Sequence, residues 1–152
     1  MAVCRSTGDT ESQATQRFVD RANARLASLG IRNTNLANPH GLDAEGHYST
    51  ARDIAALTIY ALDHEPTFRA VINTPEYTGQ GHRVTNTNRL LGTYEGLIGG
   101  KTGVTDNAGY CLMQVAERDG RRIVTVLLGS TPEDWYQDAE ALLDYGFAAT
   151  AV

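Results

Sequence analysis

The chain has 152 residues and a net charge of −5, and its hydrophobic content of 41% is near the average for a globular protein. This length is enough for one domain, and the acidic balance argues against nucleic acid as a partner, because no basic cluster exceeds the Arg121-Arg122 pair. The longest apolar run, at 123–128 with a break at Thr125, is too short to cross a bilayer. Residues 1–5 lack the apolar segment of a signal peptide, so the chain as written is expected to remain in the cytoplasm.

The first third of the chain predicts a polar leader, one helix and a long loop. Residues 1–13 are rich in polar side chains and are expected to lack regular structure. A helix is predicted over 14–29, because its apolar residues fall on one face and Gly30 suits the position after a helix end. Those apolar residues are Phe18, Val19, Ala22, Leu26 and Leu29. Residues 33–48 are dense in Asn, Gly and Pro, which predicts a loop.

Two more helices and a hairpin are predicted in the middle of the chain. Thr50 and Asp53 have the spacing of a helix capping box, and Pro66 suits the first turn of a short third helix that ends near Ile72. Residues 76–86 predict a small hairpin that turns at Gly79-Gln80-Gly81.

The last third predicts a three-stranded antiparallel sheet and a final helix. The strands are expected at 98–103, 110–116 and 122–128, and Asp119-Gly120 is a strong hairpin signal between the last two. Their apolar residues do not alternate cleanly, which indicates a sheet covered on both faces. Thr131 is expected to cap the final helix and Gly146 to end it. The fold class predicted from this order is α+β, an antiparallel sheet flanked by helices.

Lys101 is the only lysine of the chain, and it opens the tripeptide Lys101-Thr102-Gly103. Lys-Thr-Gly is the third signature of the penicillin-binding proteins and serine β-lactamases. The nucleophile of that group lies in Ser-x-x-Lys, accompanied by a Ser-x-Asn motif. None of the five serines of this chain has lysine three residues later or asparagine two residues later. The sequence therefore contains the substrate side of an acyl-transfer site without the nucleophile side.

Three blocks, the last of which contains Lys101, occur in the same order as in one known family. They are Phe-Val followed by Leu-Gly at 18–30, Asn-Pro-His-Gly-Leu and Tyr-Ser-Thr-Ala-Arg-Asp at 38–53, and Gly-Gly-Lys-Thr-Gly-Val-Thr with Ala-Gly-Tyr-Cys at 99–111. Through these blocks the chain resembles the serine D-alanyl-D-alanine carboxypeptidases, the low-molecular-mass penicillin-binding proteins, over roughly 18–147. The implied fold is a truncated β-lactamase/transpeptidase-like domain that occupies 14–152.

The resemblance implies roles for five residues. Lys101 adds positive potential to the catalytic network, the Thr102 hydroxyl binds the substrate carboxylate, and Gly103 lets the substrate approach closely. The backbone N–H of Val104 supplies half of the oxyanion hole, and Thr105 completes the substrate-binding stretch. Many relatives also have an arginine after the last strand that helps to neutralise the substrate carboxylate. This chain has Ser-Thr-Pro-Glu-Asp at 130–134 in that place.

The implied function is that of a D-Ala-D-Ala carboxypeptidase domain acting on peptidoglycan stem peptides, with β-lactams as further ligands. Because both nucleophile-side motifs are absent, the chain alone is expected to be inactive, and they are expected in a missing N-terminal segment. The alternative is a non-catalytic module that binds stem peptides, or one half of a split enzyme. Relatives of this family are exported to the cell envelope, so the location of the protein stays open. In the full fold two N-terminal strands pair beside the strand at 122–128, and without them its exposed edge predicts self-association.

No cofactor or metal is expected from the sequence. The near match to a phosphate-binding loop before Lys101 is one residue out of register, and the glycines that follow prevent the helix such a loop requires. The four histidines lack metal-ligand spacing. Cys4 and Cys111 allow at most one bridge and are expected to be two free, buried thiols.

Overall fold

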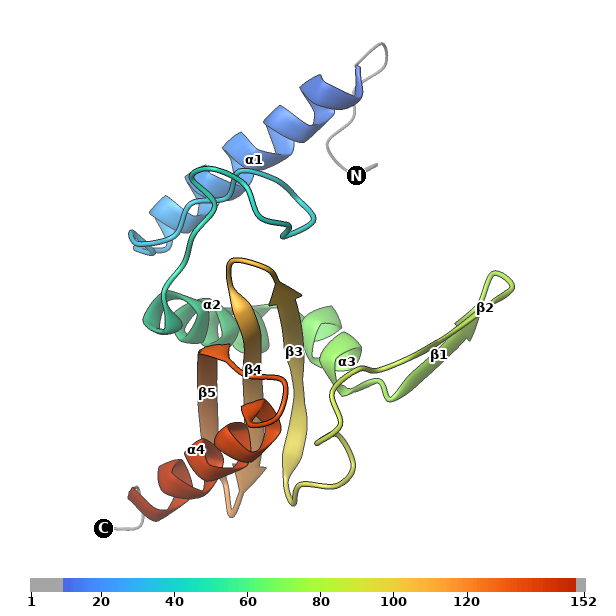
Figure 1. Ribbon diagram of the computed structural model, residues 1–152, viewed down its shortest axis with the longest axis vertical. Coiled ribbons are helices and arrows are strands. Elements are labelled where there is room, and N and C mark those ends of the chain that lie inside the picture. The colour runs from blue at the N-terminus through green and yellow to red at the C-terminus, as the bar shows by residue number, and fades with distance from the viewer. Residues whose placement is uncertain (1–9, 150–152) are drawn as a thin grey trace. The chain divides into compact units, whose positions relative to one another are not determined.

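The computed structural model describes residues 10–149, which form two compact units divided between Asp53 and Ile54. Figure 1 shows helices α1 to α4 and strands β1 to β5 in chain order. The α+β class predicted from the sequence is confirmed. No helix within 10–149 is long and apolar enough to cross a membrane.

The first unit consists of helix α1 (Glu11–Ser28) and the loop that follows it. The helix begins three residues earlier than expected, because Thr10 and Gln13 form a capping box. The Thr10 hydroxyl accepts from the Gln13 N–H at 3.3 Å, and the Gln13 side chain accepts from the Thr10 N–H at 2.9 Å. The predicted end is confirmed: Gly30 has a φ of 76°, and the N–H of Ile31 reaches back to the carbonyl oxygen of Leu26.

The loop of the first unit is held by side-chain amides and by one buried carboxylate. The Asn38 side chain bridges the loop by accepting from the Gly41 N–H and donating to the Leu42 carbonyl oxygen. Asp53 lies at the start of helix α2 (Ala51–His64) and accepts from the backbone of Asn33 and the hydroxyl of Thr34. The predicted cap of α2 is also present, since the Thr50 hydroxyl accepts from the Asp53 N–H at 3.1 Å.

The second unit is a three-stranded antiparallel sheet of order β3-β4-β5 with helices on both faces (Figure 1). Its strands are β3 (Leu97–Thr105), β4 (Gly109–Arg118) and β5 (Arg121–Ser130), each longer than the predicted segment by several residues. Asp119 and Gly120, with φ of 51° and 74°, form the expected turn between β4 and β5. Within 10–149 the outer edge of β5 has no strand beside it.

One face of this sheet packs against the Ile54–His64 part of α2 and against helix α3 (Pro66–Asn73). Its cluster of buried residues is Ile72, Ile98, Met113 and Val115. The other face packs against helix α4 (Trp135–Ala149), through Leu112 and Ala139 near the start of the helix and Ala116 and Leu143 farther along. The prediction that both faces are covered is thus confirmed.

Helix α4 differs from the prediction at both ends. Regular helix begins at Trp135, and the expected cap Thr131 instead closes the preceding turn by accepting from the Asp134 N–H at 3.2 Å. Gly146 does not end the helix, which continues to Ala149. A methyl group at Gly146 would lie 2.7 Å from Cγ2 of Ile123, so glycine at this position lets the helix approach strand β5.

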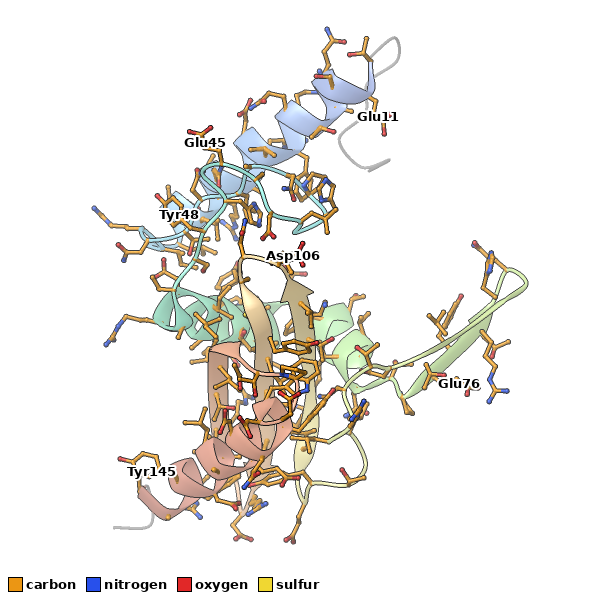
Figure 2. All side chains as sticks on the ribbon, in the orientation of Figure 1. Glu11, Glu45, Tyr48, Glu76, Asp106 and Tyr145 are labelled. Carbon is orange, nitrogen blue, oxygen red and sulfur yellow. The ribbon has the colours of Figure 1, made fainter. Side chains whose placement is uncertain are left out.

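The predicted hairpin is present as β1 (Glu76–Gly79) and β2 (His82–Thr85), a separate two-stranded sheet. Its turn residues Gln80 and Gly81 have φ of 51° and 79°. Figure 2 shows Glu76 on this hairpin, where its carboxylate pairs with Arg83 at 2.6 Å.

Candidate functional site

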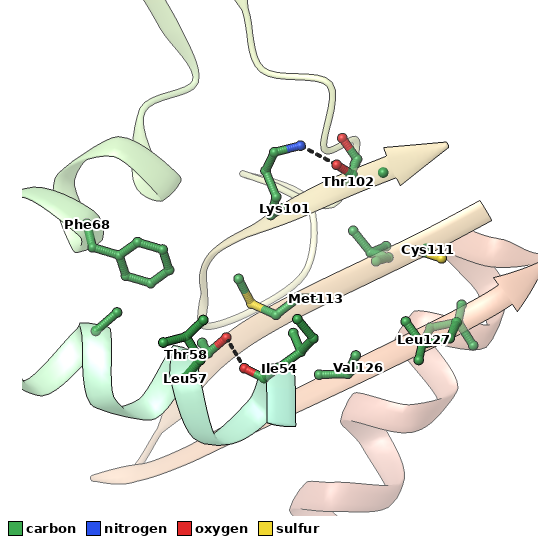
Figure 3. Close-up of a pocket in the computed structure, with 14 residues that line it drawn as sticks. Ile54, Leu57, Thr58, Phe68, Lys101, Thr102, Cys111, Met113, Val126 and Leu127 are labelled. Atoms are coloured by element: carbon green, nitrogen blue, oxygen red, sulfur yellow. Dashed lines mark hydrogen bonds between the residues drawn. The ribbon is translucent and has the colours of Figure 1, made fainter. Parts of the chain in front are cut away.

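Strand β3 forms one edge of the sheet, and its second half contains Lys101, Thr102 and Gly103. In the ladder with β4, Lys101 lies opposite Met113 and Thr102 lies opposite Leu112. The Lys101 ammonium donates a hydrogen bond to the Thr102 carbonyl oxygen (Figure 3), which places that carbonyl on the outer edge of the sheet. Because the peptide groups of an antiparallel strand alternate in direction, those of Thr102 and Val104 both face this edge.

The two glycines before Lys101 are explained by packing. A methyl group at Gly99 would overlap the carbonyl oxygen of Ile72 at the end of α3. A methyl group at Gly100 would overlap the Gln114 side chain of β4. Gly103 differs from both, because within residues 10–149, its two chain neighbours aside, no heavy atom lies within 4 Å of the position that its side chain would take. The space beside Gly103 is therefore open to a ligand.

A buried amide pair fixes the segment that runs alongside β3. Asn88 is 3% exposed and Gln114 is fully buried, and their side chains exchange two hydrogen bonds of 2.8 and 3.1 Å. The Asn88 oxygen also accepts from the N–H of Leu90 at 3.2 Å. A buried amide pair that satisfies its own donors and acceptors specifies one arrangement of the chain. It holds residues 86–90 against the central strand.

This fixed segment brings Thr87 to the Thr102 hydroxyl. The two hydroxyl oxygens are 2.7 Å apart, and the carbonyl oxygen of Thr87 accepts from the phenol of Tyr136 at 2.7 Å. Tyr136 belongs to the first turn of α4, so Thr87 is held between β3 and α4. Sequence reasoning missed Thr87 and Tyr136, and the polar run Asn-Thr-Asn at 86–88 was the only local signal.

A pocket of about 320 Å³ lies between α2, α3 and the sheet, with Lys101 among the residues that line it (Figure 3). Helix α2 contributes Ile54, Leu57 and Thr58, and the aromatic ring of Phe68 comes from α3. The strands contribute Met113 and Val126, together with Cys111, whose free thiol is half-buried instead of buried as predicted. The other predicted free thiol, Cys4, is outside the described residues. The pocket is an apolar hollow with one cation in its wall.

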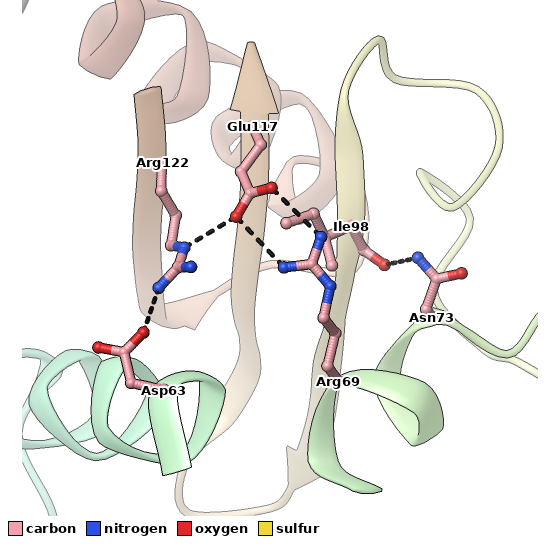
Figure 4. A network of polar contacts seen from close by, with 6 residues as sticks. All are labelled: Asp63, Arg69, Asn73, Ile98, Glu117 and Arg122. Atoms are coloured by element: carbon pink, nitrogen blue, oxygen red, sulfur yellow. Dashed lines mark hydrogen bonds and ion pairs between the residues drawn. The ribbon is translucent and has the colours of Figure 1, made fainter. Parts of the chain in front are cut away.

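A network of charges fixes the helices that form this pocket (Figure 4). Glu117 of β4 accepts from Arg69 of α3 at 3.2 Å and from Arg122 of β5 at 2.9 Å, and Arg122 also pairs with Asp63 of α2 at 2.7 Å. The hydrogen bonds from Arg69 and then Arg122 hold the pKa of Glu117 below its usual value. Asn73 adds a hydrogen bond of 2.6 Å to the Ile98 carbonyl oxygen, which joins the end of α3 to β3.

The other residues predicted for the site lie at the end of the same strand. Val104 is half exposed, and the Thr105 hydroxyl accepts from the Ala108 N–H at 3.1 Å, which closes the turn from β3 to β4. The five residues predicted for the site thus lie together because they are consecutive in one strand: Lys101, Thr102, Gly103, Val104 and Thr105.

Hydroxyl groups that could replace the absent nucleophile have other partners. The Ser49 hydroxyl lies 2.8 Å from the Thr34 hydroxyl, Ser28 donates to a helical carbonyl oxygen, and Ser130 donates to Asp138 at 2.9 Å. None of these partners is a lysine, the base that the Ser-x-x-Lys motif provides. In the part of the chain that the structure describes, no three His, Cys, Asp or Glu side chains gather as metal ligands would.

Comparison with known proteins agrees with the motifs of the sequence. A family model described as D-alanyl-D-alanine carboxypeptidase matches residues 5–131. The D-alanyl-D-alanine carboxypeptidase DacF of Bacillus subtilis (strain 168) is 35% identical over 142 residues, which cover 90% of this chain and 36% of the relative. The D-alanyl-D-alanine carboxypeptidase of Streptomyces sp. (strain K15) is 32% identical over 153 residues, which cover 93% of this chain and 52% of the relative.

Solved structures of similar proteins share the fold. The crystal structure of the Streptomyces K15 DD-transpeptidase superimposes with a TM-score of 0.87 at 32% identity, covering 94% of this chain and 58% of the solved chain. Penicillin-binding protein D2 of Listeria monocytogenes, in its cefotaxime-bound form, superimposes with a TM-score of 0.80 at 32% identity, covering 89% and 59%. The chain spans about a third of one curated relative described above, about half of the other, and about three fifths of these structures.

Proposed function

The chain belongs to the D-alanyl-D-alanine carboxypeptidase family, and we propose that it forms the substrate-binding side of an acyl-transfer site for peptidoglycan stem peptides. One observation is central to the proposal. The second half of β3 has an outer edge without a strand partner within 10–149, and open space beside Gly103. A peptide ending in D-Ala-D-Ala binds along this edge as an added strand.

Each residue of the strand has a role in the proposal. The outward peptide groups of Thr102 and Val104 pair with the backbone of the substrate, and the Val104 N–H is placed to donate to a developing oxyanion. The Thr102 hydroxyl, held by Thr87, binds the terminal carboxylate. Lys101 adds positive potential, and the absence of a side chain at Gly103 lets the substrate approach the strand. β-Lactams bind at the same edge, since they place a carboxylate and an acyl carbon in a similar arrangement.

Binding is testable by titration of the isotope-labelled chain with a short peptide ending in D-Ala-D-Ala. We expect amide signals of residues 101–104 to shift and those of the β1-β2 hairpin to stay unchanged. Thr102→Val should weaken binding severalfold, because it removes one charge-assisted hydrogen bond to the carboxylate. Thr78→Val is a matched control, since Thr78 is an exposed threonine of strand β1, in a different sheet from β3. Unchanged signals at 101–104 would contradict the proposal.

We further propose that the chain by itself does not perform acyl transfer. It has no Ser-x-x-Lys, and losing the nucleophile of a serine hydrolase lowers turnover by on the order of 10⁶-fold, as in subtilisin. Incubation with a fluorescent penicillin followed by intact-mass spectrometry should show no adduct, while an intact penicillin-binding protein used as control gains one equivalent. An adduct on any of the five serines would refute this, and Ser49, next to the 33–48 loop, is the first to test.

The pocket favours a second candidate function, that of one half of a split enzyme. Its walls are mostly apolar, with Lys101 among the lining residues, and the pocket is open to solvent, as a surface that another segment covers would be. In this case the chain alone binds no penicillin covalently, and acylation appears after addition of a separate polypeptide that contains Ser-x-x-Lys. If the mixture shows neither a complex by size-exclusion chromatography nor acylation, the split-enzyme function is rejected.

A further inference from the structure

Arg89 is an exposed cation at the end of the segment that holds the Thr102 hydroxyl in place. The segment is rigid before it, because Asn86 bonds to the Thr74 carbonyl oxygen and Asn88 belongs to the buried amide pair. Arg89 follows Thr87 by two residues, so their Cα atoms are at most about 7 Å apart. The guanidinium group packs over the Tyr136 ring, whose phenol donates to Thr87, so it belongs to the same cluster of side chains as the Thr102 hydroxyl that the proposed function assigns to the substrate carboxylate.

The Arg89 side chain is oriented by Tyr136 instead of by an acid. Its guanidinium carbon lies 5.4 Å from the centroid of the Tyr136 ring, and the backbone N–H of Arg89 donates to the phenol oxygen at 3.4 Å, which fixes the main chain from which the side chain extends. The same phenol donates to the Thr87 carbonyl oxygen. Within residues 10–149 no carboxylate forms an ion pair with Arg89, in contrast to Arg69, Arg83 and Arg122, so its charge is not neutralised by an acid of the described chain.

A carboxylate bound at Thr102 needs a nearby cation. The Lys101 ammonium donates to the main-chain carbonyl oxygen of Thr102, whereas the carboxylate is proposed to bind at the side-chain hydroxyl of Thr102. The loop from β5 to the Tyr136 turn contributes Glu133 and Asp134 and has no cation. These acids would repel the substrate carboxylate, and Arg89 is the cation that this part of the fold places beside Thr87 and Tyr136.

We propose that Arg89 supplies the positive charge that recognises the terminal carboxylate of the substrate at Thr102, with Thr87 and Tyr136 as positioning residues. This inference rests on the proposed function, because it names the group that completes the carboxylate subsite of the same strand. It makes Arg89 a specificity-determining residue that favours a free C-terminal carboxylate over an amide.

The test compares two probes on the full chain: a short peptide ending in D-Ala-D-Ala and the same peptide with a C-terminal amide. Binding of each is measured by NMR titration at about 0.05 M and about 0.5 M salt. We expect Arg89→Gln to lower the ratio of acid to amide affinity about fivefold at low salt, as for a unit charge within a Debye length of the anion. Arg89→Lys should keep most of the ratio. Arg83→Gln removes the same charge from the β1-β2 hairpin and should leave the ratio unchanged.

The outcomes separate this inference from the proposed function. If wild type prefers the acid and Arg89→Gln keeps the same preference, the role of Arg89 is wrong and the role of the strand stands. If wild type binds neither probe at residues 101–104, the proposed function and this inference are both overturned. A ratio that falls equally in Arg83→Gln would indicate a general charge effect and would also overturn the role of Arg89.

Discussion

Replacing Asn88 by alanine tests whether the buried amide pair fixes the segment beside β3. The change leaves three buried groups without partners: the side-chain N–H and oxygen of Gln114, and the N–H of Leu90. An unsatisfied buried polar group costs about 1–3 kcal/mol, and water entering the space left by Asn88 offsets part of this. We expect Asn88→Ala to lower the free energy of unfolding by about 3 kcal/mol.

Urea denaturation followed by circular dichroism measures this loss, together with thermal unfolding. For a domain of this size, about 3 kcal/mol corresponds to a midpoint lower by roughly 1.5 M urea or a Tm lower by roughly 9 °C. The control adds Gln114→Leu to Asn88→Ala, which removes the unpaired amide and keeps a similar volume. The double variant should regain about 1–2 kcal/mol relative to Asn88→Ala. A loss below about 1 kcal/mol in the single variant, or a double variant less stable than the single, would refute the reasoning.

Two further variants test the packing of α4 and the charge network. Gly146→Ala gains about 1 kcal/mol of helix propensity but forces a methyl group against Ile123, so we expect the free energy of unfolding in urea denaturation to fall by roughly 1 kcal/mol. In an Ile123→Ala background the same change should stabilise the protein. Stabilisation with Ile123 present would contradict the predicted contact. In the folded protein the pKa of Glu117 lies below its ordinary value of 4.5. The ionised carboxylate therefore stabilises the fold by about 1 kcal/mol at this partly exposed site. This stabilisation is present above pH 4.5 and is lost as pH falls through the folded pKa. Glu117→Gln should therefore be less stable than wild type at pH 7 and equal to it near pH 2, and a difference that persists at pH 2 would show that the bonds to Arg69 and Arg122 are not the cause.

Local signals predicted most of the fold. The apolar face of 14–29, the Thr50 cap and the Asp119-Gly120 turn each depend on residues within a few positions of one another, and all three are present. The errors also have local causes. The early start of α1 follows from the Thr10 and Gln13 capping box, which the polar composition of residues 1–13 obscured. Self-association through the outer edge of β5 stays a prediction.

The family and the five candidate residues at 101–105 could be named from sequence, because a motif of consecutive residues keeps its order whatever surrounds it. The surroundings of that motif were decided only by the tertiary structure. Thr87 meets Thr102 across 15 positions, and the phenol of Tyr136 meets Thr87 across 49. Gly146, which suits a helix end by its own preference, lies inside a helix because Ile123 packs against it. Contacts between distant positions leave no periodic pattern in the chain, since they depend on how whole elements pack, and packing free energy outweighs local propensity where the two disagree.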